Sequence, residues 1–191
     1  MLPLPEEAQA VLRDAEEHMK KSVVHLQQEL AHIRAGKATP ELLDGIKVDY
    51  YGTHLPINQL ASISTPDARL IVVQPWDKGA ISAIEKAIQS SGLGLNPSND
   101  GNVIRIPIPP LTEERRRELV KQVRRIGEEA KIAVRNIRRD ALEEVRRLQK
   151  EAHLPEDLRF AAEEEIQKMT NRHIERIDQL LAAKEKEIME V

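Results

Sequence analysis

The stretch Ile106–Leu119, "IPIPPLTEERRREL", separates two kinds of sequence in this chain. Before it, short runs rich in Val and Ile are bounded by Gly, Pro and Asn, which is typical of strands. After it, Thr112 suits a helix N-cap, and the acids Glu113 and Glu114 suit a first helical turn. The prolines prevent either structure from continuing into the other. The stretch therefore predicts that a strand-containing region ends here and that a long helix begins.

Three parts of the chain repeat apolar residues at intervals of three and four, which indicates amphipathic helices. The first covers residues 6–34, the second begins at Thr112, and the third follows the break at Pro155, where Glu156 and Asp157 suit its first turn. None of the three is apolar all round, so each must bury its apolar stripe against the others. A three-helix bundle formed by residues 1–36 and 112–191 is the simplest solution.

Residues 37–111 predict a small α/β domain inserted between the first two helices of the bundle. The runs "IKVDYYG", "LASIST", "RLIVVQP" and "VIRIPIP" read as strands. The run "KGAISAIEKAIQSS" between them reads as a short helix that ends at Gly92. The predicted fold class is therefore α+β, with a helical bundle and an inserted α/β, β-sandwich-like domain.

The chain crosses between the two predicted domains twice, at about residues 34–39 and 107–111. Glycine tolerates backbone angles that other residues resist, whereas proline fixes φ and removes a hydrogen-bond donor. Neither crossing is expected to continue a helix or sheet that would join the domains rigidly. The sequence predicts a hinge formed by Arg34, Gly36, Pro107, Pro109 and Pro110.

Composition limits the classes of function. The chain has no cysteine, which excludes disulfides and thiolate metal sites, and no apolar run approaches the roughly 20 residues of a membrane span. Its start, "MLPLPEEAQA", is acidic where a targeting peptide would be basic, so a cytoplasmic location is expected. Only four aromatic residues are available to stack on unpaired bases.

Basic residues concentrate on the second long helix. Residues 112–152 hold 13 Lys and Arg against nine Asp and Glu, although the whole chain has a net charge of −3. At 100° per residue, eight of them fall in one lane about 44 Å long: Arg117, Lys121, Arg124, Lys131, Arg135, Arg138, Arg139 and Arg146. The lane is either a solvated face with local ion pairs or a ridge that binds phosphates. If it binds nucleic acid, folded RNA recognised by its backbone suits the shortage of aromatics best.

No motif indicates an enzyme, a cofactor or a metal site, so no catalytic residue is predicted. The stretch "GKAT" at residues 36–39 lacks the Gly and the Ser or Thr that a phosphate-binding loop requires. His18, His25 and His32 share a helical face, but successive members lie about 10.5 Å apart along the axis, too far to share a metal. Two alternatives remain, a coiled-coil protein that pairs between chains and an unrecognised hydrolase.

Five motifs, in this order, resemble the ribosome recycling factor family: "ELLDGIKVDYYGT", "LPINQLASI", "AIEKAI", "GLGLNPSNDGNVIRIPIPPLTEERRREL" and "AVRNIRRDA". The resemblance covers nearly the whole chain from about residue 10. It implies an L-shaped protein in which a three-helix bundle carries a hinged α/β domain. Lys37 and His54 depart from the residues that are common in the family at these positions.

The resemblance also implies a function and partners. A protein of this family binds the large ribosomal subunit after termination and, with elongation factor G and GTP, splits the complex so that mRNA and tRNA leave. Its partners would be large-subunit rRNA and elongation factor G, with no membrane and no DNA, and the protein would be a monomer. The resemblance assigns rRNA contacts to Arg135, Arg138 and Arg139.

Overall fold

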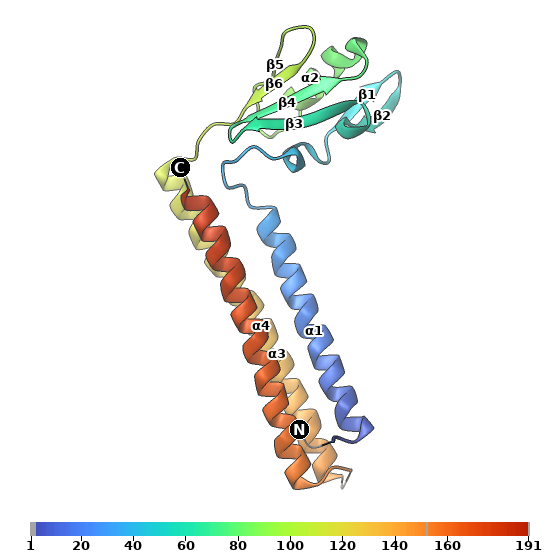
Figure 1. The fold of residues 1–191 in the computed structure, drawn as a ribbon, viewed down its shortest axis with the longest axis vertical. Coiled ribbons are helices and arrows are strands. Elements are labelled where there is room, and N and C mark those ends of the chain that lie inside the picture. The colour runs from blue at the N-terminus through green and yellow to red at the C-terminus, as the bar shows by residue number, and fades with distance from the viewer. Residues whose placement is uncertain (1–2, 152, 191) are drawn as a thin grey trace. The chain divides into compact units, whose positions relative to one another are not determined.

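The computed structural model describes residues 3–151 and 153–190 of the chain, which fold as two compact units (Figure 1). Residues 3–34 and Glu113–Glu190 form the helical unit, and Ala35–Thr112 form the sheet unit. In the described part of the chain, no helix combines the length and apolar character needed to span a membrane.

Three long helices make up the helical unit, α1 (Glu6–Ala31), α3 (Glu113–Lys150) and α4 (Glu156–Met189). Each packs against the other two (Figure 1). Acidic residues occupy the first turn of all three, where they oppose the positive end of the helix dipole. The core between them is aliphatic, and its fully buried side chains include Met19, Leu26, Val123, Val134, Val145, Ile166 and Ile177. The predicted three-helix bundle is confirmed.

A glycine allows α3 and α4 to approach closely. A β-carbon at Gly127 would overlap Cγ and both δ carbons of Leu181, with the Cγ atom at only 2.9 Å. Glycine costs about 1 kcal/mol relative to alanine inside a helix, so its place here needs a compensating reason. The reason is that Leu181 fills the space that a side chain at position 127 would occupy.

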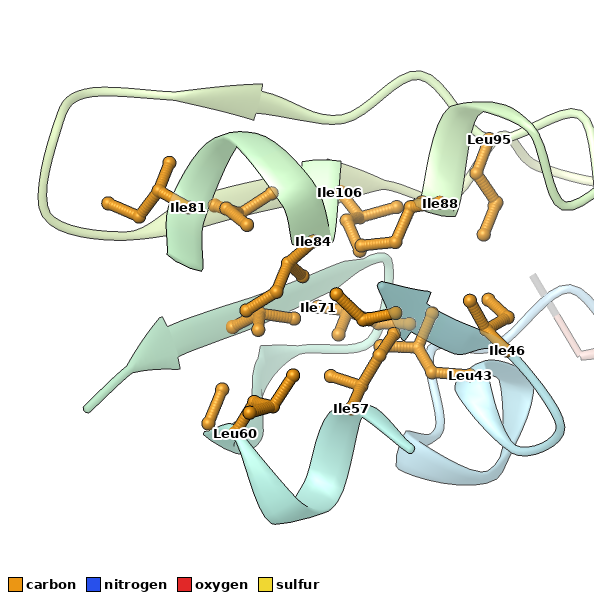
Figure 2. Close-up of a cluster of buried hydrophobic side chains, with 14 of the residues drawn as sticks. Leu43, Ile46, Ile57, Leu60, Ile71, Ile81, Ile84, Ile88, Leu95 and Ile106 are labelled. Carbon is orange, nitrogen blue, oxygen red and sulfur yellow. The ribbon is translucent and has the colours of Figure 1, made fainter. Parts of the chain in front are cut away.

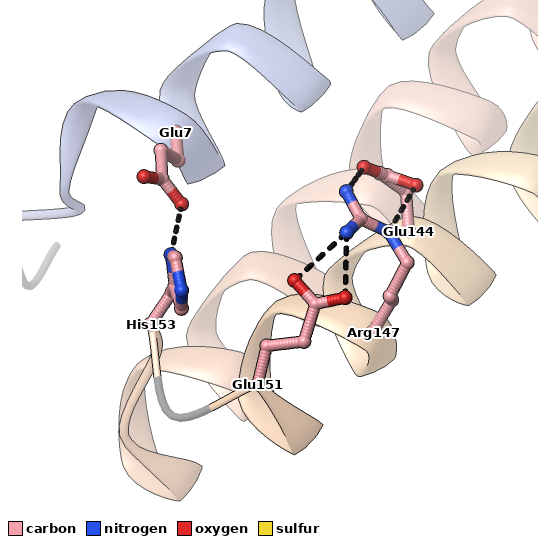
Figure 3. A network of polar contacts seen from close by, with 5 residues as sticks. All are labelled: Glu7, Glu144, Arg147, Glu151 and His153. Carbon is pink, nitrogen blue, oxygen red and sulfur yellow. Dashed lines mark hydrogen bonds and ion pairs between the residues drawn. The ribbon is translucent and has the colours of Figure 1, made fainter.

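A group of polar contacts lies at the end of the bundle where α3 ends (Figure 3). Arg147 donates hydrogen bonds to Glu144 on one side and to Glu151 on the other. This guanidinium lowers the pKa of the Glu144 carboxyl, so the pair stabilises the fold near neutral pH and the stabilisation is lost as the pH falls through the lowered pKa. His153 Nδ1 lies 3.0 Å from Glu7 Oε2 and links the α3–α4 connection to α1.

The sheet unit has a four-stranded antiparallel sheet in the order β3–β4–β6–β5 and a separate hairpin. Its strands are β1 (Lys47–Tyr50), β2 (Thr53–Pro56), β3 (Ala61–Asp67), β4 (Leu70–Pro75), β5 (Ser98–Asn99) and β6 (Ile104–Pro107), and α2 covers Ile81–Gln89. The four predicted strands and the predicted helix are present. The sequence did not indicate β2 or β5, because "THLP" and "SN" lack the alternation of apolar residues that marks a strand.

Branched aliphatic side chains fill the core of the sheet unit (Figure 2). Ile84 and Ile88 from α2 are fully buried, as are Ile71 from β4 and Ile106 from β6. Ile57 reaches the same cluster from the turn between β2 and β3. The unit therefore has a core made of its own residues.

The two connecting segments are anchored to the turn between β3 and β4. The Ala38 backbone N–H donates to Ala68 O at 2.7 Å, and the Ile108 N–H donates to Arg69 O at 2.8 Å. Pro107 is the last residue of β6, where it lies opposite Leu70, so it belongs to the sheet and not to the connection. Residues 35–37 and 109–112 remain outside any strand or helix.

Gly127→Ala tests the close approach of α3 and α4. Alanine should be better than glycine by helix propensity, but overlap with Leu181 should cost about 1–3 kcal/mol. We expect a lower midpoint of thermal unfolding, measured by circular dichroism. Adding Leu181→Ala should remove part of the loss, because it opens space for the new methyl group. A higher midpoint for Gly127→Ala alone would mean that the two helices are not packed as described.

Candidate nucleic-acid interface

The eight basic residues of the lane all lie on α3, on the face that turns away from its buried stripe. Six of them are exposed, namely Arg117, Lys121, Arg124, Arg135, Arg139 and Arg146. Lys131 and Arg138 are half-buried, although the sequence alone placed Arg138 well away from the apolar stripe. The helix therefore presents the lane to its surroundings, but two of its members lie close to neighbouring side chains.

Three members of the lane pair with carboxylates of α4. Arg124 Nε lies 3.0 Å from Glu185, Lys131 Nζ lies 2.5 Å from Asp178, and Arg146 Nε lies 3.1 Å from Glu163. These pairs bridge the two helices along their shared edge. The prediction from sequence considered α3 alone and did not include these pairs. They neutralise part of the positive charge that was predicted for the lane.

Three further members pair with carboxylates of their own helix. Arg117 lies 2.6 Å from Glu113, Arg135 lies 3.3 Å from Glu128, and Arg139 lies 3.5 Å from the neighbouring Asp140. All of these side chains are 46–77% exposed. Exposed pairs of this kind contribute only about 0.2–1 kcal/mol, so a phosphate can displace the carboxylate at little cost.

The last two members of the lane are Lys121 and Arg138. In residues 3–151 and 153–190, neither has a carboxylate or hydrogen-bond partner in the structure. Arg138 stands between Arg135 and Arg139 along the helix, and the Asn136 side chain is exposed beside them. Lys121, about two turns into α3, and Arg138, near its middle, are therefore the least compensated cations of the lane, and an arginine can donate several hydrogen bonds to phosphate oxygens.

The edge of α3 that lies next to α1 differs from the lane in its charge. A groove between α1 and α3 has a volume of about 650 Å³, and a second, smaller one of about 420 Å³ shares His18 and Ile137 with it. Four carboxylates line the larger groove, from Glu7, Asp14, Asp140 and Glu144, and so does Arg147, which pairs with Glu144. Carboxylates outnumber basic side chains in this lining, which makes the lane the better candidate of the two faces for contact with phosphates.

Other candidate sites lack support in the structure. The "GKAT" stretch leads into a short 3₁₀ turn, Pro40–Leu43, whereas a phosphate-binding loop leads from a strand into an α-helix. Across the described residues, no group of three or more His, Asp or Glu side chains is placed to hold a metal ion.

Comparison with known proteins shows the family of the chain as a whole. The sequence matches the ribosome recycling factor family over residues 26–189. It is 60% identical to the ribosome-recycling factor of Halalkalibacterium halodurans over 181 residues, which is 95% of this chain and 98% of that protein. The ribosome-recycling factor of Symbiobacterium thermophilum is 55% identical, with the same coverage.

Solved structures agree with the sequence comparison. The solution structure of a ribosome recycling factor matches with a TM-score of 0.77 and 47% identity, over 98% of this chain and all of that one. The T. thermophilus factor, described together with E. coli elongation factor G on the E. coli post-termination complex, matches with a TM-score of 0.62 and 51% identity, over 96% of this chain and 99% of that one. The chain belongs to the ribosome recycling factor family.

Proposed function

We propose that this protein recycles ribosomes after translation termination. It binds the large ribosomal subunit and, with elongation factor G and GTP, separates the post-termination complex so that mRNA and tRNA leave. The observation that carries the proposal is the match to ribosome-recycling factors along almost the whole chain, at up to 60% identity. At that level of identity, both units and the connections between them are shared with proteins of this function.

The face that binds rRNA is proposed to be the middle of α3. Arg135, Arg138 and Arg139 donate to backbone phosphates there, while Lys121 and Arg117 extend the positive surface along the helix. Lys131, Arg124 and Arg146 make a smaller contribution, because carboxylates of α4 already neutralise them. Neutralising phosphates releases bound cations, so the affinity for the subunit should fall steeply as the salt concentration rises.

The protein is proposed to act without catalysis, as a cytoplasmic monomer. Elongation factor G hydrolyses the GTP, and this chain binds and moves. The motion is a rotation of the sheet unit about the connecting segments, with Gly36, Pro109 and Pro110 as the central hinge residues and Arg34 beside them. Pro107 is a weaker candidate than the sequence suggested, because it pairs within β6.

Co-sedimentation with large ribosomal subunits, with and without elongation factor G and GTP, tests the proposed function. Without elongation factor G, the protein should pellet with the large subunit. With elongation factor G and GTP, it should convert post-termination complexes into separate subunits. Light scattering follows that conversion in real time. A protein that pellets with the subunits but leaves the complexes intact would contradict the proposed recycling step.

Arg138→Ala should weaken binding to large subunits without unfolding the protein. One lost phosphate contact should lower the affinity about 3- to 10-fold and reduce the slope of log K against log salt concentration by about 1. The measurement is a binding titration at several salt concentrations, with circular dichroism as the folding control. Arg125→Ala is a matched control, because Arg125 is an exposed arginine of α3 outside the lane. Equal losses for both variants would argue against a specific phosphate-binding face.

Glu128→Gln should have the opposite effect on affinity. Glu128 holds Arg135 at 3.3 Å in the free protein, and a phosphate must replace it. Removing the carboxylate should strengthen subunit binding about two- to fivefold, since an exposed ion pair of about 0.2–1 kcal/mol no longer competes. Glu129→Gln is the control, because Glu129 pairs with Arg125 instead. Unchanged affinity for Glu128→Gln would mean that Arg135 does not contact the subunit.

Gly36→Ala tests the hinge. Gly36 has φ +75°, and a β-carbon there would lie 2.9 Å from Leu111 Cγ, in the other connecting segment. We expect the variant to bind large subunits normally but to split post-termination complexes more slowly. Gly94→Ala is the matched control, because Gly94 has φ +71° and open space around it. If both variants recycle ribosomes at the same rate, strain in the connection is not important for the mechanism.

A further inference from the structure

Two neutral side chains lie among the cations in the middle of α3. Ile132 is 49% exposed, and among the residues of α3, all of which the structure describes, it is the only large apolar side chain that is exposed. Asn136, one turn further along the helix, is also exposed, and its amide has no hydrogen-bond partner in the described part of the chain. A single exposed apolar residue is ordinary, but this one adjoins an amide without a partner, beside the lane.

These two side chains and two arginines of the lane form one patch. Residues three and four apart are neighbours on a helix, so Ile132 adjoins Arg135, and Asn136 adjoins Arg139. The two arginines are themselves one turn apart, about 6 Å along the axis. Each pairs only with an exposed carboxylate, at 3.3 and 3.5 Å, which a phosphate can displace. Phosphates bound by these arginines would therefore lie next to Ile132 and Asn136.

The chemistry of the two neutral side chains suits the sugar that links successive phosphates. Ile132 can pack against the carbon atoms of a ribose. The Asn136 amide offers both a donor and an acceptor, which match a 2′-hydroxyl that also donates and accepts. An unpaired base is a less suitable ligand, because α3 has no aromatic side chain on which a base could stack.

An RNA double helix of the A form presents such sugars in its minor groove. That groove is wide and shallow and displays the 2′-hydroxyls, whereas the major groove is deep and narrow. Isoleucine and asparagine are short side chains, so they can reach a shallow surface from a helix but not the floor of a deep groove.

We propose that Ile132 and Asn136 contact the ribose edge of an A-form rRNA helix in its minor groove, while Arg135 and Arg139 bind the adjoining phosphates. The inference rests on the proposed rRNA-binding face of α3. It adds recognition of the 2′-hydroxyl, the group by which a protein distinguishes RNA from DNA.

The salt dependence of binding to large subunits tests the proposal. Asn136→Ala should weaken binding about 3- to 10-fold and Ile132→Ala about two- to fivefold, because a hydrogen bond and an apolar contact are lost. The slope of log K against log salt concentration should not change in either variant, since neither side chain neutralises a phosphate. Arg138→Ala, by contrast, should reduce that slope by about 1. The thermal midpoints should not fall, because both positions are exposed and alanine favours a helix.

Gln122→Ala and Val24→Ala are matched controls that should bind within about twofold of the original protein. Gln122 is an exposed amide of α3 nearly four turns from Asn136, and Val24 is 48% exposed on α1. If either Asn136→Ala or Ile132→Ala binds like the original, or loses affinity together with a smaller slope, the ribose contact is refuted. If Arg138→Ala itself binds normally, the proposed rRNA-binding face is wrong, and the inference fails with it.

Hydroxyl-radical cleavage of the rRNA examines the contact itself, because these radicals attack the sugar. With subunits saturated by protein, the double variant Ile132→Ala/Asn136→Ala should leave a few riboses open to cleavage that the original protein protects. Arg138→Ala at saturation should still protect them. An identical pattern of protection for the double variant and the original protein would overturn the proposal.

Discussion

The antiparallel packing of α3 against α4 is the constraint on which the rest of the helical unit depends. Gly127 lets the two helices approach until Leu181 fills the space of the missing side chain. That approach sets the register between the helices, and the register decides which cations of α3 meet a carboxylate. Arg124 and Lys131 are neutralised in this way, whereas Arg138 is not. The same packing that stabilises the bundle therefore also shapes its charged surface.

The sheet unit is built differently, because it has a hydrophobic core made of its own residues. Isoleucines from α2 and the sheet form its core, and backbone hydrogen bonds at Ala38 and Ile108 attach the connecting segments to it. What remains between these anchors and the helices is short and contains Gly36 and two prolines. A short connection of this kind is compatible with the proposed rotation of the sheet unit, because no helix or strand runs through it.

Local sequence patterns predicted the fold well. The candidate site was predicted less completely, because several of its ion pairs join residues that are far apart in the sequence. The three helices and the change of structure near Thr112 follow from periodicity and capping, which depend on neighbouring residues. Strand β5 has only two polar residues and exists because β6 pairs with it, so no local signal marks it. The basic lane could also be predicted from the sequence of α3 alone. Its partial neutralisation by Asp178 and Glu185 depends on another helix, yet their spacing of two turns was available as a signal.

A structure of this protein bound to the large ribosomal subunit, determined by cryo-electron microscopy, tests the central claim most directly. The claim is that the cations of α3 left unmatched by α4 are the ones that bind rRNA. The predicted result has Arg138 and its neighbours Arg135 and Arg139 within about 3 Å of phosphate oxygens, with Arg124 and Lys131 still paired to α4. Contact through α1 or α4, or through Arg124 and Lys131 released from their carboxylates, would contradict it.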